Sequence, residues 1–177
     1  MSSPADYYDL SRIRPEVLAA LDKINAMGPA FAARAKAVDD DASFPTENYK
    51  DLADAGFLGL SIPQEFGGWG FSMGEYAMVG AEIAKYCGAT ALTFNMHNSS
   101  MAWSRFMFDM PNLTAEEKAE FAPLRARQFT RAMKERAIFS QPISEGGQNW
   151  TSKPNQTQAR AFEGGWKING FKKFASL

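Results

Sequence analysis

Between residues 15 and 136 the apolar positions of the chain recur every three or four residues, which predicts helices rather than strands. The periodic segments are residues 15–38, 46–55, 72–87, 89–108 and 114–133. The first segment contains Gly28-Pro29, where we expect a kink or a brief break because proline cannot donate the helical hydrogen bond. The fourth is apolar on most sides, which is typical of a helix that is central to a bundle or packs on a partner.

Several residues predict where these helices begin and end. Ser72 with Glu75, and Thr114 with Glu117, have the spacing of capping boxes, in which each side chain bonds to the other residue's backbone amide. Thr46 can cap the short second helix. The stretch "GFLGLSIPQEFGGWGFS", residues 56–72, has too many glycines for a helix and predicts a long ordered loop.

After residue 136 the pattern changes toward alternation. "AIFSQP", "TQARAF", "GWKIN" and "FKKFAS" predict short strands, with turns at Glu163-Gly164-Gly165 and Asn169-Gly170. The chain ends inside the last of these strands. We therefore expect a mainly α fold: a polar lead-in at residues 1–13, a helical domain at 14–136, and the beginning of a truncated β domain at 137–177.

Composition narrows the class of protein. Hydrophobic residues make up 45% and charged residues 22%, as in soluble globular proteins, and the formal net charge is −1. This balance gives no field that would favour nucleic acid or an anionic membrane. A single cysteine and no apparent targeting segment make a cytoplasmic location the default.

Few residues offer independent catalytic chemistry. His97 is the only histidine and Cys87 the only cysteine, so no His/Cys metal cluster can form. We favour a packed or helix-capping His97 over a catalytic one, and a buried structural thiol over a reactive one. Neither GxGxxG nor GxxxxGK[ST] occurs, so neither phosphate-loop motif applies.

Two further features leave alternatives open. The Ser/Gly loop "ISEGG", residues 143–147, can present backbone N–H groups to a phosphate, but such a loop is more often an ordinary surface loop. A basic cluster can contact an anionic ligand, although a solvated helix face is the commoner interpretation. Its members are Arg125, Arg127, Arg131, Lys134 and Arg136.

Taken together, three motifs resemble the acyl-CoA dehydrogenase family. Gly56-Phe57-Leu58-Gly59, Pro63 and Glu65-Phe66-Gly67-Gly68-Trp69-Gly70 resemble the turn and glycine loop between two helices of its N-terminal domain. "AIFSQPISEGG" resembles its flavin-binding strand and loop, although the family's Thr-Glu-Pro is Ser140-Gln141-Pro142 here. "EGGWKINGFKKFASL" resembles the later segment that meets the flavin. The three motifs also have the order and spacing of the family, and the resemblance covers nearly the whole chain after the first dozen residues.

The resemblance implies an N-terminal helical bundle followed by the first strands of an antiparallel β-barrel domain that together help to hold FAD. It places strand residues Phe139 and Ser140 at the flavin ring. By the same resemblance, Ser144 and Gly146 are expected near the pyrophosphate and the acyl-CoA entrance. Phe174 is expected to pack on the flavin as the family's aromatic residue does, and Ser176 to hydrogen-bond the ring; such groups fix a flavin and tune its electron affinity.

The resemblance also implies an activity, α,β-dehydrogenation of an acyl-CoA thioester with hydride transfer to FAD. The electron acceptor would be an electron-transferring flavoprotein, and the intact protein a homo-oligomer. The carboxylate base belongs to a C-terminal helical domain absent from these residues, so none here is expected to be catalytic and the fragment alone is expected to be inactive. Met96, His97 and Met101 are candidates for the substrate pocket. The alternatives are a flavin monooxygenase on the same fold and a non-catalytic helical interaction module.

Overall fold

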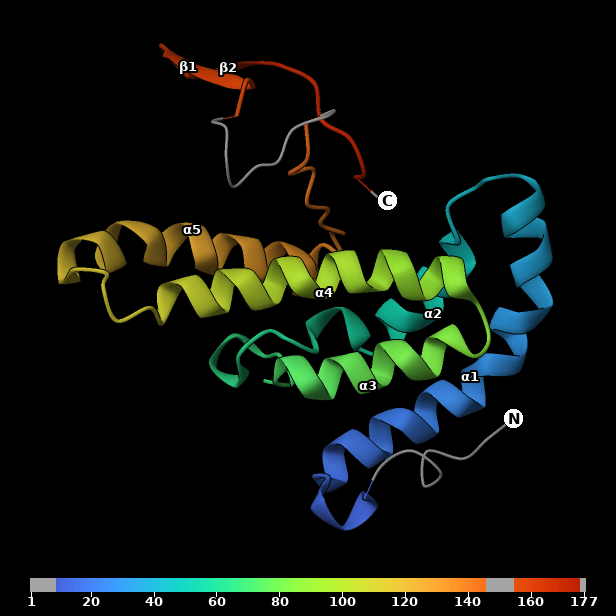
Figure 1. The fold of residues 1–177 in the computed structure, drawn as a ribbon. Helices are drawn as coiled ribbons and strands as arrows, with labels where there is room; N and C mark the ends of the chain where they lie inside the picture. The colour runs from blue at the N-terminus through green and yellow to red at the C-terminus, as the bar shows by residue number, and fades with distance from the viewer. Residues whose placement is uncertain (1–8, 146–154, 176–177) are drawn as a thin grey trace. The chain divides into compact units, whose positions relative to one another are not determined.

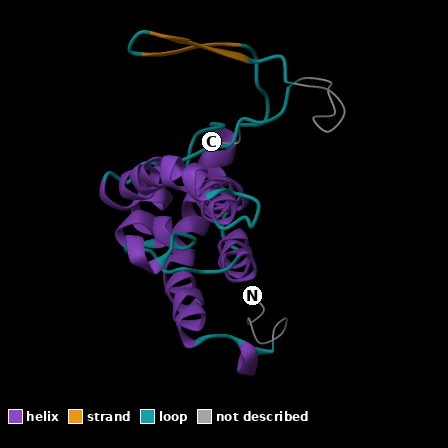
Figure 2. Cartoon of the chain, turned by 90° about the vertical axis from the view of Figure 1, so that its left-hand side faces the viewer, coloured by secondary structure: helices purple, strands orange, loops and turns teal. Residues whose placement is uncertain are grey.

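The computed structural model describes residues 9–145 and 155–175. The chain divides into two compact units, Met1–Phe139 and Ser140–Leu177. The described part of the first unit is helical (Figures 1 and 2). Its helices are α1 (Pro15–Asp40), α2 (Thr46–Asp54), α3 (Met73–Ala84), α4 (Gly88–Phe108) and α5 (Ala115–Lys134), with short 3-10 turns at Leu10–Arg12, Phe57–Gly59 and Gln64–Phe66.

The core of the first unit forms where α3 packs against both α1 and α4 (Figure 1). Ile24, Val79 and Phe94, one from each of these helices, are fully buried. A smaller cluster joins α4 and α5 to the loop after α2, through Ile62, Met101 and Phe129 among others. Each fully buried side chain of this size contributes about 1.5–3 kcal/mol relative to exposure, so the apolar stripes seen in the sequence account for the packing.

Of the two alternatives expected at Gly28-Pro29, the break is absent, because α1 continues through Pro29 to Asp40. Figure 1 shows its axis changing direction along its length, as a proline inside a helix explains. Gly28 has a packing role instead: a Cβ there would lie 2.4 Å from the ring of Tyr86. The Tyr86 hydroxyl donates to Asn25 Oδ1 at 2.7 Å, and its ring lies against Gly28.

Both predicted capping boxes are present, at Ser72–Glu75 and Thr114–Glu117. The assignment of Thr46 was one residue late, because Pro45 is the N-cap of α2 and makes no side-chain cap bond. Gly56 follows α2 in the left-handed region (φ 84°), where glycine is favoured.

Glu75 joins its capping box to α1. Its carboxylate accepts from the Ser72 amide at 2.7 Å and from Arg14 Nε at 2.6 Å and Nη2 at 3.0 Å. The bond from Arg14 is the main reason that the pKa of Glu75 falls to about 2, helped by the Ser72 amide.

We expect Glu75→Gln to lower the free energy of unfolding by about 1.5 kcal/mol at pH 7, because a cap and a bidentate ion pair are weakened together. Since the folded-state pKa is depressed, this stability is present above the ordinary pKa of 4.5 and is lost as pH falls toward 2. Urea unfolding at several pH values measures it. The matched control is Glu117→Gln, in a box with no ion pair among the described residues, which should cost about 0.5 kcal/mol. Equal losses in the two variants would contradict the role of Arg14.

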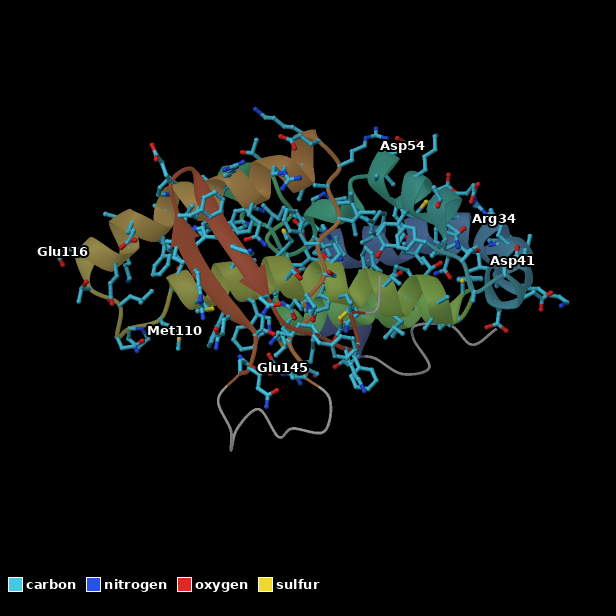
Figure 3. All side chains as sticks on the ribbon, turned by 90° about the horizontal axis from the view of Figure 1, so that it is seen from above. Arg34, Asp41, Asp54, Met110, Glu116 and Glu145 are labelled. Atoms are coloured by element: carbon cyan, nitrogen blue, oxygen red, sulfur yellow. The ribbon has the colours of Figure 1, made fainter. Side chains whose placement is uncertain are left out.

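The basic residues of α5 and the turn after it are largely engaged within the first unit. Arg131 pairs with Glu135 at 3.1 Å, and Arg136 pairs with Asp54 at 2.6 Å. Arg125 stacks on Phe108, 3.6 Å from the ring centroid. Arg34 likewise joins α1 to Asp51 of α2 at 2.6 Å (Figure 3 labels Arg34 and Asp54). These contacts favour a solvated, paired face over an anion site.

The described part of the second unit contains one antiparallel hairpin, β1 (Gln158–Phe162) with β2 (Gly165–Asn169). Its register pairs Gln158 with Asn169 and Phe162 with Gly165, around a turn in which Gly164 has φ 89°. Nearly all of its residues are exposed. A two-stranded hairpin with so little burial is marginally stable by itself.

Two of the predicted strands are wrong. In "AIFSQP" the Ala137 amide donates to Arg131 O at the end of α5, and the Phe139 amide donates to His97 Nδ1, so neither is available to a strand partner. In "FKKFAS" the described residues make one bridge, between Lys173 and Ser144, instead of a continuous ladder.

No helix in the described ranges is long and apolar enough to cross a membrane.

Candidate functional site

His97 holds the C-terminal end of the first unit in place through its hydrogen bonds. It lies on α4 and is fully buried. Its Nε2 is 2.9 Å from the carbonyl oxygen of Leu58, and its Nδ1 accepts the Phe139 N–H at 3.2 Å. The imidazole therefore bridges the 3-10 turn after α2 and the segment that follows α5.

These two bonds determine the protonation state of His97. Because Nδ1 accepts, it carries no proton, and Nε2 then donates its proton to Leu58 O. Burial lowers the pKa of His97, against a smaller opposing effect of the bond to Leu58. The ring is neutral and both nitrogens are engaged, which agrees with a packed histidine and leaves no nitrogen for acid–base catalysis.

Phe139 is held in place both by its backbone N–H, which donates to His97, and by its side chain. Its half-buried ring packs on the cluster of Ile62, Met101 and Phe129 and lies 6.2 Å from the His97 ring. Ser140, the next residue, is exposed. The histidine therefore positions Phe139, which is itself a predicted flavin contact and immediately precedes Ser140.

In the second unit, the two predicted flavin segments lie side by side. The Lys173 amide donates to Ser144 O at 2.8 Å, and the two residues form an antiparallel bridge. Since Phe174 follows Lys173, the loop residue and the aromatic residue singled out from the sequence are brought close together. Ser144 itself is half-buried.

Glu145 organises this part of the second unit. Its carboxylate accepts the amides of Gln156 at 2.6 Å and Thr157 at 2.9 Å, and pairs with Lys172 Nζ at 2.8 Å. The bond from Lys172 and then those from Thr157 and Gln156 hold the pKa of Glu145 at about 2. Sequence reasoning missed this residue; an acid inside a Ser/Gly loop was the available signal.

Phe174 presents an exposed aromatic side chain. The residue is 78% exposed, and its φ of 58° is in the left-handed region, which is uncommon for a bulky residue. Such backbone strain costs about 1–3 kcal/mol and clusters at functional sites. An exposed ring fits the planar face of a flavin, and the chain segment that carries it is paired with Ser144 through Lys173.

The structure says less about the roles of the remaining predicted site residues. Gly146 and Ser176 lie outside the described residues. Met101 is fully buried in the cluster with Phe129, and Met96 is half-buried on α4. Among the described residues, no group of three or more His, Cys, Asp or Glu is placed to hold a metal ion.

The comparison with known families decides the relationship. Residues 25–123, more than half of the chain, match the family model described as acyl-CoA dehydrogenase, N-terminal domain. The chain belongs to the acyl-CoA dehydrogenase family. The matched region runs from α1 into α5 and includes the glycine loop at residues 56–72.

Relatives within the acyl-CoA dehydrogenase family have varied substrates in their names. The chain is 26% identical over 142 residues to benzylmalonyl-CoA dehydrogenase of Aromatoleum aromaticum, covering 80% of this chain and 35% of that protein. It is 28% identical over 135 residues to the human mitochondrial short-chain specific acyl-CoA dehydrogenase, covering 76% and 30%. The chain thus spans about a third of the length of these two curated relatives.

Solved structures share the fold at lower identity. The nitrososynthase from Micromonospora carbonacea var. africana matches with a TM-score of 0.70 and 22% identity, over 90% of this chain and 38% of that one. FMN-bound TdsC from Paenibacillus sp. A11-2 matches with a TM-score of 0.67 and 24% identity, over 87% and 35%. At this identity the likeness establishes the acyl-CoA dehydrogenase fold alone.

Proposed function

We propose that this chain is the N-terminal portion of an FAD-dependent acyl-CoA dehydrogenase that carries out α,β-dehydrogenation of an acyl-CoA thioester. The observation that carries the proposal is the pairing of Ser144 with Lys173. It brings together the two segments that resemble the family's flavin-binding segments, in a chain of this family. The proposal extends to an electron-transferring flavoprotein as acceptor, a homo-oligomeric intact protein and a cytoplasmic location.

The chain's own residues would bind and orient the cofactor. Phe174 would pack on the ring system, and the hydroxyl groups of Ser140 and Ser144 would hydrogen-bond its polar edge or phosphates. Glu145 keeps the loop of Ser144 in place through its bonds to Gln156, Thr157 and Lys172. When bound, the flavin supplies the site that accepts a hydride from the acyl chain.

FAD should bind the 177-residue chain weakly, because most contacts to such a cofactor would come from residues beyond this chain. We expect a two-dimensional amide NMR titration with FAD to shift the signals of residues 139–145 and 171–175. Phe174→Ala should remove these shifts, whereas Phe171→Ala, which changes another exposed phenylalanine (67%) of the same segment, should preserve them. Tight stoichiometric uptake would refute the expectation of weak binding, and shifts confined to α1–α5 would refute the site.

The activity is tested on the complete reading frame that carries this chain. The purified protein, loaded with FAD, is mixed anaerobically with acyl-CoA thioesters of increasing chain length and no other electron acceptor. Loss of flavin absorbance with formation of the enoyl thioester, and recovery of that absorbance when a one-electron acceptor is then added, support the dehydrogenase. A flavin monooxygenase on the same fold would instead consume oxygen with reduced flavin and an aromatic substrate.

A further inference from the structure

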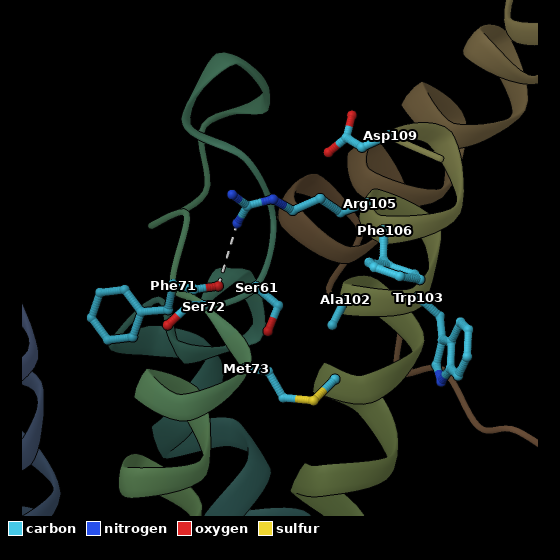
Figure 4. Close-up of a pocket in the computed structure, with 9 residues that line it drawn as sticks. All are labelled: Ser61, Phe71, Ser72, Met73, Ala102, Trp103, Arg105, Phe106 and Asp109. Carbon is cyan, nitrogen blue, oxygen red and sulfur yellow. Dashed lines mark hydrogen bonds between the residues drawn. The ribbon is translucent and has the colours of Figure 1, made fainter. Parts of the chain in front are cut away.

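A cavity of about 580 Å³ lies in the first unit, between the segment 61–73 and the second half of α4 (Figure 4). Met73, at the start of α3, and Ala102, on α4, contribute to its walls. The small side chain of Ala102 leaves room that a larger residue would fill. The cavity belongs to none of the flavin segments, which lie at residues 139–145 and beyond.

Ser61 is the unusual residue of this cavity. It is 1% exposed, and its Oγ has no hydrogen-bond partner in the part of the chain that the structure describes. Figure 4 shows the hydroxyl directed toward the space between Met73 and Ala102. Buried hydroxyl groups are normally hydrogen-bonded, and an exception calls for an explanation. A ligand atom in the cavity would give Ser61 the partner that the protein does not supply.

The walls of the cavity suit an aromatic ring. Trp103 and Phe106 lie edge to face, with ring centroids 6.0 Å apart, and both remain half exposed or more, at 49% and 60%. Met73 is directed toward Ala102 from the opposite wall, and its flexible thioether is a good contact for aromatic groups. Exposed apolar side chains that gather around a cavity mark binding sites more often than accidental surface.

The charges in the cavity favour a neutral ligand. Arg105 Nη1 donates to the carbonyl oxygens of Gly70 at 3.2 Å and Phe71 at 3.4 Å, so this nitrogen is used to tie α4 to the glycine loop. Asp109, the C-cap residue of α4, contributes the opposite charge. The two formal charges cancel, so the cavity has no net attraction for an anion or a cation.

We propose that this cavity binds a neutral aromatic molecule carrying one hydroxyl group. The ring lies against Met73, Trp103 and Phe106, and the hydroxyl hydrogen-bonds to Ser61 Oγ. The inference is independent of the proposed flavin function, because it uses residues of α3, α4 and the loop before α3 only.

The test uses calorimetric titration of the 177-residue chain with 2-naphthol and with 2-methylnaphthalene, which has nearly the same shape without the hydroxyl. We expect 2-naphthol to bind about tenfold more tightly, as the hydrogen bond to an otherwise unpaired group requires. In Ser61→Ala this preference should disappear, and the melting temperature should not fall, because an unpartnered hydroxyl is removed. Equal affinities of the two compounds for the unmodified chain, or an unchanged preference in Ser61→Ala, would overturn the proposal.

Two further variants locate the binding. Ala102→Leu fills the cavity and should abolish binding of both compounds; if it does not fold, Met73→Trp, made at an exposed position, blocks the cavity from the other side. Ser100→Ala is the matched control, since it removes a buried hydroxyl that is already bonded to Met96 O at 2.9 Å. Binding that survives a folded cavity-filling variant would place the ligand elsewhere and refute the site. Loss of binding through self-association, seen by sedimentation, would assign the apolar mouth to a second copy and equally refute it.

Discussion

Replacing Gly68 by alanine should lower the free energy of unfolding by about 3 kcal/mol, because the added methyl group would meet backbone that cannot move aside. A Cβ at Gly68 would lie 2.1 Å from the carbonyl oxygen of Ile62 and 2.5 Å from its Cβ. The segment around Gly68 folds back onto residues 59–62, with the Trp69 amide on Gly59 O at 3.0 Å and the Gly70 amide on Ile62 O at 2.8 Å. Relief of the clash would break these bonds as well.

Gly80→Ala is the matched control for Gly68→Ala. Gly80 lies inside α3, and a Cβ there meets no atom within 4 Å. Alanine is the better helix former, so this variant should be more stable than the parent by about 0.5–1 kcal/mol. Urea unfolding of the three proteins measures both effects. A loss below about 1 kcal/mol in Gly68→Ala would mean that the loop relaxes around the methyl group.

The helical part of the fold was predictable because its signals are local. The capping boxes at Ser72 and Thr114 each involve residues three positions apart, and the apolar stripes of α1 and α3 repeat within one or two turns. The glycine loop was recognisable for the same reason. Its need for glycine at position 68 was not, because the clash is with Ile62 across a backward fold of the chain.

The strand predictions failed where distant groups use the backbone. "AIFSQP" alternates as a strand does, yet its Phe139 amide donates to His97, 42 positions away. Alternation of apolar and polar residues indicates which side chains can be buried, but it does not predict which acceptor each backbone amide will bond to. The same limit applies to "FKKFAS", in which Lys173 alone among the described residues makes a bridge, to Ser144.

The site was partly predictable. Resemblance singled out Ser144 and Phe174 separately, and the structure shows that their segments adjoin. It did not indicate Glu145, whose role depends on the folded positions of Gln156, Thr157 and Lys172. The unpaired hydroxyl of Ser61 also has no sequence signature, because its burial and lack of a partner are tertiary properties.

Replacing His97 by leucine should cost about 3 kcal/mol, because it leaves the Leu58 carbonyl and the Phe139 amide without their partner. The side chain is of similar size, so the loss would reflect the hydrogen bonds more than a cavity. Asn98→Leu is the matched control: Asn98 is the adjacent buried polar residue, and among the described residues its Nδ2 bonds to Phe94 O alone, within α4, at 3.2 Å. It should cost less than about 1 kcal/mol, since no second element of the fold is released.

His97 should also give the fold a pH dependence that its leucine variant lacks. Burial depresses the pKa of His97 in the folded state, whereas in the unfolded chain it is near 6.5. Between these two values the unfolded chain binds a proton that the folded chain refuses, so stability falls as pH decreases from about 7 toward 5. The slope cannot exceed about 1.4 kcal/mol per pH unit for one group. Because the chain has a single histidine, the assignment is unambiguous.

Urea unfolding at pH 7.5, 6.5 and 5.5 separates this effect from the carboxylates. Glu75 and Glu145 have pKa values of about 2 in the folded state, so they change stability only below their ordinary pKa of 4.5. The parent chain should lose stability across the three pH values, and His97→Leu should be level. The imidazole NMR signals of the folded parent should stay those of the neutral, Nε2-protonated form at pH 5.5. A histidine that becomes charged near pH 6.5 without loss of stability would show that the Phe139 amide does not depend on Nδ1, and that another contact holds the segment leading to Ser140.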